Sequence, residues 1–534
     1  MRPKLLSRLF VVVLGAAAFA ASCHRQPARA VDASVAPTLR LYLLSTTAGA
    51  IEPCGCTKDM LGGIDHAAAF VAAGAKEAPH AVVLAAGPML FMNPTIDPAR
   101  KTQDQWKAEA LSRAFAALGL SAWAPGANDW ALGVDELSSL QKTSRADVLA
   151  SNLSGATDGA KSTRVMDVNG VKLGLAGVSD PESPLGAPPG VVVGDAQAAL
   201  ARALADLKKQ GAEVTVALVA ADRGRAVRLA DAVPGFDVFV VGKSFEQGDG
   251  NDAEMPPTLI GDTLVVQAPN HLQAIAVVDL FVRGNFDFKD GTGIADEERK
   301  ESLTARISEL DSRIRDGESH GAAAADLDAR RKDLSRLKDE LAKIPATQTP
   351  PDGSFFRYRL QEVRERLGTD ASMKGLLSDY YQRVNDYNKE AFKNKVPTPA
   401  AKGESSYIGI EACANCHDEA YKFWQKTPHS HAYATLSDEH KEFNLDCVSC
   451  HVTGYEKPGG TTVTHVDGLK DVQCEVCHGP GSRHEDHPTD KSLIIASPPK
   501  TLCAATCHHP PHVAATWSVD DSWKIIVGKG HGEK

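Results

Sequence analysis

Cysteine is absent from the long middle of this chain. All 11 cysteines among the 534 residues lie before residue 57 or after residue 412. A secreted protein that is stabilised by disulfides would spread its cysteines more evenly, so the clustering excludes a disulfide scaffold and indicates cofactor attachment. The chain also lacks an excess of positive charge, with 58 Lys and Arg against 68 Asp and Glu and a formal net charge of −10. This balance argues against nucleic acid as a partner.

The N-terminal residues have the pattern of an export signal. Basic residues come first, then an apolar run over residues 9–21, and small residues lead to Cys23. The run is too short to cross a bilayer as a stable anchor, and the order of the three parts is that of a signal peptide. We therefore predict a signal peptide over residues 1–22 and a tether, rich in Ala, Pro and Arg, over residues 23–37.

The cysteine that ends this signal allows two interpretations. Ala-Ser-Cys resembles a bacterial lipobox, in which Cys23 becomes the lipidated first residue, and the alternative is an ordinary secretory signal with an incidental cysteine. The position of Cys23 favours the lipobox, and His24 after it favours, by the same resemblance, the outer membrane over the inner one. We expect an exported, periplasmic lipoprotein that contacts the outer membrane through its lipid anchor.

Three Cys-x-x-Cys-His motifs indicate covalent haem attachment. In this motif two thiols add to the haem vinyl groups, and the adjacent histidine is placed to give the iron its proximal ligand. At this composition roughly 0.008 such motifs are expected by chance. Paired Cys-x-x-Cys motifs also build zinc sites, but the histidine that follows each pair and the export signal favour haem. The three motifs contain Cys413, Cys416 and His417, then Cys447, Cys450 and His451, then Cys474, Cys477 and His478.

A fourth motif is irregular. Three residues, instead of two, separate Cys503 from Cys507, and His508 follows. Some multihaem cytochromes tolerate this spacing, so we expect four haem c groups, of which this one has the least regular site. The residues from 407 onward contain many His, Pro, Gly and charged side chains and few large aliphatic ones. Four haems would supply the missing apolar interior, so this part should fold poorly without them.

The residues around these motifs resemble the tetrahaem cytochrome c-552/4 family over about residues 405–534. The shared patterns are Tyr407-Ile-Gly409, Trp424-x-x-Thr427-Pro428-His429, Cys450-His451-Val-Thr-Gly454, Gly479-Pro480-Gly481-x-x-His484 and His531-Gly532. The resemblance implies a mainly helical and loop-containing domain in which His429, His484 and His531 are distal iron ligands. It also implies that one iron is five-coordinate, although His465 or His512 could close that site. Haems with two histidine ligands transfer electrons, whereas an open iron can bind a small ligand.

Residues 38–290 alternate apolar runs with amphipathic stretches, which predicts an α/β layered fold. The predicted strands cover residues 39–45, 81–86, 122–125, 148–152, 171–178, 214–220 and 238–241. The predicted helices cover residues 64–75, 103–118, 195–210 and 224–232.

This α/β part resembles the calcineurin-like metallophosphatases of the 5′-nucleotidase type. The landmarks follow the family's order and include Ile51-Glu52-Pro53, Ala86-Gly87, Ser151-Asn152-Leu153, Pro234-Gly235-Phe236-Asp237 and Val266-Gln267-Ala268. Such phosphatases need Asp, His and Asn side chains to hold two metal ions that activate water. Where the resemblance places these ligands, the chain has Thr46-Thr47-Ala48, Pro88, Gly126-Ala127-Asn128-Asp129, Ala221, Lys243 and Phe245. We therefore expect the α/β part to lack metal-dependent phosphatase activity.

Two cysteines, Cys54 and Cys56, follow the first predicted strand and are separated by a single glycine. Thiols at this spacing are poorly placed for a relaxed disulfide with each other. They could form a redox pair or bind a soft metal ion. The alternatives are a strained local disulfide or two buried free thiols, and the pattern leaves all of these open.

Two segments join the α/β part to the cytochrome part. Residues 295–345 are charged, and apolar residues recur at helical spacing in each half, with a break near residues 316–321. This spacing predicts an antiparallel helical hairpin with a coiled-coil-like apolar seam. Residues 350–395 are predicted as a helical connector, mainly through an amphipathic helix over residues 370–393.

These patterns support three hypotheses on function. The first is a lipid-anchored multihaem cytochrome that exchanges electrons with redox partner proteins and uses the α/β part as a non-catalytic docking or sensing domain. The second is an oxidoreductase that converts a small nitrogen or sulfur compound at a five-coordinate haem. The third is a binding module whose N-terminal cleft recognises a nucleotide-like or other ligand. We expect the first.

Overall fold

A computed structural model describes most of the chain that follows the predicted signal and tether. The described residues are 36–53, 60–157, 159–181, 186–320, 324–344, 349–509, 513 and 517–531. The predictions on Cys23, on the pair Cys54 and Cys56, and on His512 lie outside these residues.

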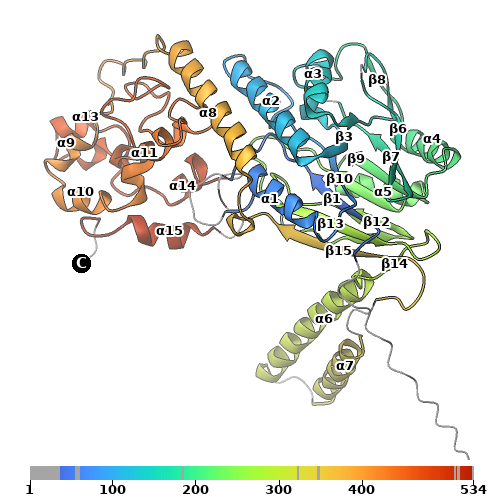
Figure 1. Cartoon of the computed structure of the whole chain (residues 1–534). Helices are drawn as coiled ribbons and strands as arrows, with labels where there is room; N and C mark the ends of the chain where they lie inside the picture. Colours follow the sequence, from blue (N-terminus) through green and yellow to red (C-terminus); the bar gives the residue numbers. More distant parts are fainter. Residues whose placement is uncertain are drawn as a thin grey trace, which may run out of the picture. The chain divides into compact units, whose positions relative to one another are not determined.

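Seven strands form the first of two large sheets: β1 (Leu39–Ser45), β2 (Ala81–Ala86), β3 (Leu120–Ala124), β4 (Asp147–Val148), β13 (Ala274–Phe281), β14 (Lys289–Asp290) and β15 (Phe355–Glu362). Their order in the sheet is β14-β15-β13-β1-β2-β3-β4. Figure 1 labels β1, β3, β13, β14 and β15 of this sheet. The strands from β1 to β4 pair in parallel, whereas β13 pairs antiparallel with both β1 and β15.

Six strands form the second sheet: β6 (Thr163–Val168), β7 (Val171–Val178), β9 (Val214–Ala220), β10 (Val238–Gly242), β11 (Thr258–Ile260) and β12 (Thr263–Val266). Their order is β11-β12-β10-β9-β7-β6, and the four central strands pair in parallel. All residues of β1 and β9 are buried, as expected for strands whose two faces are both covered. A separate pair consists of β5 (Leu153–Gly155) and β8 (Val191–Val193).

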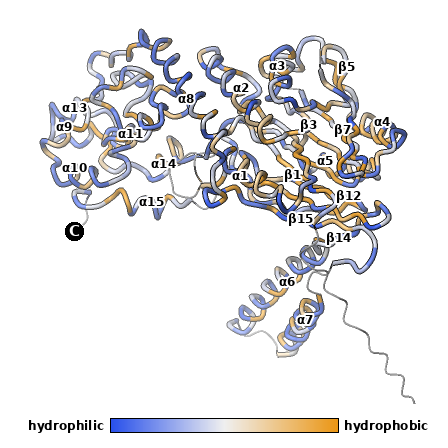
Figure 2. Tube along the Cα trace, in the orientation of Figure 1, coloured by the Kyte–Doolittle hydropathy of each residue, from blue (hydrophilic) through white to orange (hydrophobic). Residues whose placement is uncertain are grey.

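The two sheets pack face to face, and helices cover their outer faces. Side chains alternate along β1, so that Leu41 and Leu43 lie in the core between the sheets, whereas Tyr42 and Leu44 lie under the outer helices. The first sheet is covered by α1 (Ile64–Gly74), α2 (Lys101–Leu118), α3 (Val134–Ser144) and α8 (Ala371–Ala391), and the second by α4 (Ala196–Lys209) and α5 (Arg223–Ala232). Figure 2 shows the apolar strands inside this arrangement. The predicted α/β layered fold is confirmed.

The structure differs from the sequence prediction at several places. It contains α3 and the strands β5, β6, β8 and β11–β14, which were not predicted from the sequence. Of the strand expected over residues 148–152, only Val148 belongs to a strand, the two-residue β4. The helical connector expected over residues 350–395 begins instead with β15, which pairs along its whole length with β13. Its helix, α8, packs Leu377 and Tyr380 into the core under the first sheet. The segment is therefore part of the α/β core.

A helical hairpin lies between β14 and β15 in the chain, at the residues where the sequence predicts one. It consists of α6 (Ile294–Ser319) and α7 (Ala324–Ala342), which pack against each other. Leu303, Ile314, Leu327 and Leu337 are buried along the seam. No helix among the described residues has the length and apolar character that a membrane span needs.

The cytochrome part consists of short helices and loops, as predicted. The helices are α9 (Ile410–Ala414), α10 (Asp418–Trp424), α11 (Ala432–Ser437), α12 (Cys474–His478), α13 (Ser482–Asp486), α14 (Thr501–Thr506) and α15 (Val519–Ile526). Three-residue or four-residue 3-10 turns lie at η3 (Pro428–His431), η4 (Val448–Cys450) and η5 (Lys491–Leu493). The apolar cluster of described residues in this part is small, with Tyr433, Val448, Val452 and Val466.

Candidate haem-binding site

Each attachment motif closes a tight turn that brings its thiols and its histidine together. In the first motif, the backbone N–H of His417 donates to the carbonyl of Cys413 at 2.9 Å. In the irregular fourth motif, the N–H groups of Cys507 and His508 both donate to the carbonyl of Cys503, at 3.2 and 2.8 Å. The turn thus accommodates the extra residue and still returns the histidine to the first cysteine.

Thiols of different motifs lie in contact. None of the eight motif cysteines forms a disulfide. The Cys413 thiol hydrogen-bonds that of Cys474, and this contact together with burial raises the pKa of Cys413. The Cys450 thiol hydrogen-bonds that of Cys507, which lowers the pKa of Cys450 to about 6. The first motif therefore adjoins the third, and the second adjoins the fourth.

The third and fourth motifs are neighbours as well. Burial raises the pKa of Cys477 to about 11, and the nearby Cys503 adds to this rise. The four attachment motifs thus lie close together, and the first contacts the third while the second contacts the fourth.

Two histidine pairs have a separation that suits a shared iron ion. The ring centres of His417 and His484 are 6.5 Å apart, with 27° between the planes. Those of His429 and His508 are 6.2 Å apart, with 45° between the planes. Two imidazoles that bind one metal ion at about 2 Å per nitrogen have ring centres roughly 6 Å apart. Each pair joins a motif histidine with a predicted distal ligand.

The third predicted distal ligand, His531, lies near the histidine of the third motif. Burial lowers the pKa of His531, and the charge of His478 lowers it further. The predicted distal histidines therefore lie beside the first, fourth and third motifs. Of the two alternative ligands, His465 lies 3.1 Å from the hydroxyl of Thr464, and His512 is outside the described residues.

Hydrogen bonds orient two of the motif histidines for iron. His478 Nδ1 lies 2.7 Å from the carbonyl oxygen of Ile495, and His451 Nδ1 lies 2.5 Å from that of Ala432. Because a carbonyl only accepts, Nδ1 carries the ring proton and Nε2 keeps its lone pair. Such a hydrogen bond fixes the tautomer and the orientation of histidine ligands in metal sites. The thiols and the ring nitrogens together fit covalently attached haem.

In the α/β part, a buried carboxylate occupies one of the positions that the resemblance assigns to metal ligands. Asp129 is 1% exposed. It accepts hydrogen bonds from the backbone N–H groups of Met89, Leu90 and Gly126 at 2.7–3.1 Å. Burial raises its pKa to about 7, although these bonds oppose the rise. The side chain holds the loops after β2 and β3 together.

Its neighbours at the strand ends have similar contacts. The Asn128 amide donates to the carbonyls of Phe91, Met92 and Phe245 at 2.7–3.2 Å. The Thr46 hydroxyl donates to the Lys243 carbonyl at 3.0 Å. Within the described ranges, no three His, Cys, Asp or Glu side chains are grouped in a way that could hold a metal ion.

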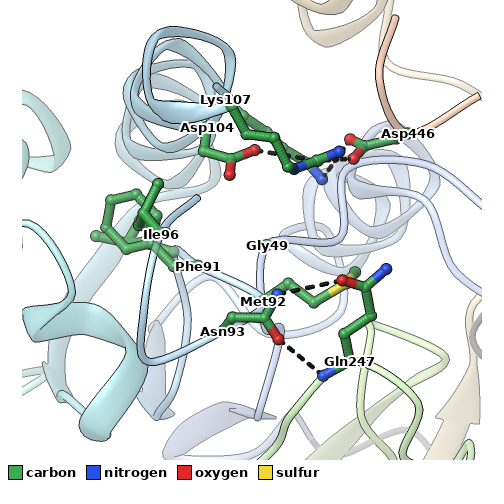
Figure 3. A pocket seen from close by; sticks show the side chains of 11 residues that line it. Gly49, Phe91, Met92, Asn93, Ile96, Asp104, Lys107, Gln247 and Asp446 are labelled. Atoms are coloured by element: carbon green, nitrogen blue, oxygen red, sulfur yellow. Dashed lines mark hydrogen bonds and ion pairs between the residues drawn. The ribbon is translucent and has the colours of Figure 1, made fainter. Parts of the chain in front are cut away.

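Sequence reasoning missed one set of contacts, between α2 and the residues that precede the second motif. Asp446 forms ion pairs with Arg100 and, at 2.9 Å, with Lys107. Figure 3 shows Lys107 and Asp446 in contact at the wall of a cavity. The cavity has a volume of about 30 Å³. The local sequence does not predict this contact, because charged residues at these positions have the pattern of a solvent-exposed helix surface.

The motifs, their contacts and the histidine pairs define a c-type cytochrome segment. Residues 412–479 match the family described as cytochrome c554 and c-prime. A curated relative is cytochrome c-554 from Nitrosomonas europaea, which is 30% identical over 115 residues. The match covers 18% of this chain and 49% of the relative, so the chain spans about half the length of the curated protein that it matches.

Solved structures similar to this chain include three bacterial enzymes of low sequence identity. A 5′-nucleotidase precursor from Thermus thermophilus has 18% identity and a TM-score of 0.44, over 70% of this chain and 62% of its own. The sulfate thiohydrolase SoxB from Thermus thermophilus has 14% identity and a TM-score of 0.45, and the match covers 81% of this chain and 74% of its own. The NAD nucleotidase of Haemophilus influenzae has 18% identity and a TM-score of 0.38, and the match covers 45% of this chain and 46% of its own.

Proposed function

We propose that this chain is an exported, lipid-anchored multihaem c-type cytochrome that transfers electrons between redox partner proteins. The observation that carries the proposal is the clustering of four attachment motifs. The contact of Cys413 with Cys474 joins the first and third motifs, and that of Cys450 with Cys507 joins the second and fourth. Neighbouring attachment sites suit stepwise electron transfer better than one isolated catalytic centre.

The motif cysteines would hold the haem groups, and the histidines would bind iron from both sides. When bound, haem supplies a one-electron couple whose potential depends on axial ligands, hydrogen bonding and burial. The chain's own residues set these factors. The carbonyls of Ala432 and Ile495 orient two proximal rings, and His484 and His429 stand opposite the rings of His417 and His508.

The α/β part has a non-catalytic role in this proposal. A two-metal phosphatase needs free carboxylate, amide and imidazole groups for its ions. The side chains of Asp129 and Asn128 are instead engaged with backbone groups of the loops around them. A docking role does not need these side chains to be free.

Intact-mass spectrometry of the exported protein, together with haem staining, tests the attachment. We expect a mass excess of four haems in the wild type and of three in Cys503→Ser/Cys507→Ser. A wild type without covalent haem would reject the proposal. A large high-spin fraction in the visible spectrum that shifts with nitrite, hydroxylamine or CO would favour an oxidoreductase over an electron carrier.

The lipid anchor rests on the sequence around Cys23 and has its own test. Wild-type protein from a bacterial host should enter the detergent phase in a Triton X-114 partition. The Cys23→Ser variant should be exported and remain in the aqueous phase. Equal partition of both proteins would contradict the anchor and leave the haem assignment untouched.

A further inference from the structure

Side chains of the α/β part hold the pre-motif loop, the residues 443–446 that directly precede the second attachment motif. The loop begins at Phe443, whose backbone N–H donates to Asn385 and whose carbonyl accepts from Asn388, both at 2.9 Å. Both asparagines belong to α8 and are buried. The backbone of the loop is thus fixed at its start by two amide side chains.

The middle of the pre-motif loop is bound by α2. Gln103, which is 1% exposed, donates to the side-chain oxygen of Asn444 at 3.1 Å and accepts from the N–H of Leu445 at 3.0 Å. The same oxygen of Gln103 accepts from Asn388 at 2.8 Å, so the contacts of α2 and α8 form one network. Arg100 adds a hydrogen bond to the carbonyl of Leu445 at 3.2 Å.

The end of the pre-motif loop carries a charge that two cations of the α/β part compensate. Asp446 pairs with Arg100 and with Lys107, and the side chains of all three are at most 30% exposed. Burial opposes the ionisation of Asp446, but Lys107 and Arg100 hold its pKa well below the usual range. The carboxylate is therefore charged and held in one place.

The loop in turn sets the start of the second motif. The carbonyl of Asn444 accepts the backbone N–H groups of Cys447 and Val448, both at 3.0 Å. These bonds begin the turn that continues into η4 and ends at His451. A displacement of the loop would therefore displace the first attachment thiol of that motif.

The contacts lie where α/β folds hold their ligands, at loops that follow the carboxyl ends of strands. Glu52, after β1, pairs with Lys441 at 2.7 Å. Asn251, after β10, donates to the carbonyl of Val513 at 2.8 Å. The cavity beside Asp446 has a volume of about 30 Å³, room for about one water molecule. Residues of the cytochrome part thus occupy this edge of the sheet.

We propose that the α/β part is the positioning partner of the second haem site, with Arg100, Gln103 and Lys107 as positioning residues. They fix the pre-motif loop and, through it, the orientation of the haem that Cys447 and Cys450 hold. A buried polar network that is satisfied in one arrangement specifies that arrangement, and ligand orientation and nearby charge tune a haem's potential. This inference rests on the proposed haem attachment, and it identifies the second haem site as the partner to which the α/β part docks.

The test uses the full-length exported protein and compares Arg100→Met/Lys107→Met with wild type. The readouts are the haem count from intact mass, the electron paramagnetic resonance spectrum and the midpoint potentials from a redox titration. We expect that the variant still carries four haems. The resonance signal and the midpoint potential of one haem should change, and those of the other three should not. Arg113→Ala is the matched control, because Arg113 lies on α2 and pairs with Glu109 at the exposed surface.

Two further variants separate positioning from general stability. Arg100→Lys/Lys107→Arg keeps both charges and should restore most of the wild-type signal. Asp446→Asn keeps the shape of the loop and should reproduce the single-haem shift even if the double methionine variant fails to fold. Wild-type spectra and potentials in Asp446→Asn would overturn this inference. Absence of haem from Cys447 and Cys450 in the wild type would instead reject the haem assignment itself.

Discussion

Replacing Asp129 with alanine should destabilise the α/β part by about 3–5 kcal/mol, because three buried N–H groups lose their common acceptor. The side chain is 1% exposed, and it receives bonds from Met89, Leu90 and Gly126. The alanine variant removes all of these bonds and leaves the backbone donors inside the protein.

The magnitude follows from the number of donors. Each buried N–H without an acceptor costs about 1–3 kcal/mol, so three would cost about 3–9 kcal/mol. Two effects reduce this sum: water can enter the space that the carboxyl group leaves, and the variant no longer buries an ionisable group. The lower part of the range, about 3–5 kcal/mol, is therefore expected. Asp129→Asn should lose about half as much, because its oxygen can still serve Met89 and Leu90.

Native-state hydrogen exchange measures this loss locally, in peptides that cover β2 and the turn η1 (Ala127–Trp130). Asp231→Ala is the control, because Asp231 is exposed on α5 and surface changes of this kind stay within about 0.5 kcal/mol. A loss below about 1 kcal/mol for Asp129→Ala would refute the reasoning. The reasoning would also be refuted if divalent metal ions stabilised the wild type but not the variant, because Asp129 would then be a metal ligand.

Three further predictions concern the haems, the pH dependence and the α/β chemistry. His484→Ala should convert one low-spin haem to high spin in the electron paramagnetic resonance spectrum, whereas the exposed His440→Ala should not. The pKa of Asp129, raised to about 7 by burial, exceeds that of an unfolded carboxyl group at about 4. The contribution of Asp129 to the free energy of unfolding should therefore be full below about pH 4 and lost as the pH rises through about 7. Urea unfolding at pH 5 and at pH 8 should detect this loss. In Asp129→Asn the difference between the two pH values should disappear. With added Mn²⁺, hydrolysis of p-nitrophenyl phosphate or AMP should not exceed that of buffer, and a hydrolysis that EDTA abolishes would contradict the non-catalytic role.

The parts of the structure with strong local signals could be predicted from the sequence. Largely apolar runs such as those of β1 and β9 indicate strands with two buried faces, and the structure has both at the expected residues. The attachment motifs are chemical signatures that need no knowledge of the fold. His484 and His429, expected as distal ligands from a family resemblance, lie opposite motif histidines.

The features that were missed depend on residues far apart in the sequence. β15 carries Arg357 and Arg359 between its apolar residues, so its pattern is weak, and it enters the first sheet only after a helical hairpin of the intervening residues. The contact of Arg100 with Asp446 joins positions separated by 346 residues. Such contacts depend on the packing of α2 and α8 against the cytochrome part, and a periodicity along the chain cannot reveal them.

The contacts between the attachment motifs have a consequence for how the protein matures. The first motif contacts the third, and the second contacts the fourth, so each contact joins motifs that are not consecutive along the chain. Neither contact can form before the later motif of the pair has been synthesised. A chain that ended before Cys503 would keep three motifs but lose the contact of Cys450 with Cys507. Late truncations should thus alter the surroundings of the second motif as well as remove the fourth.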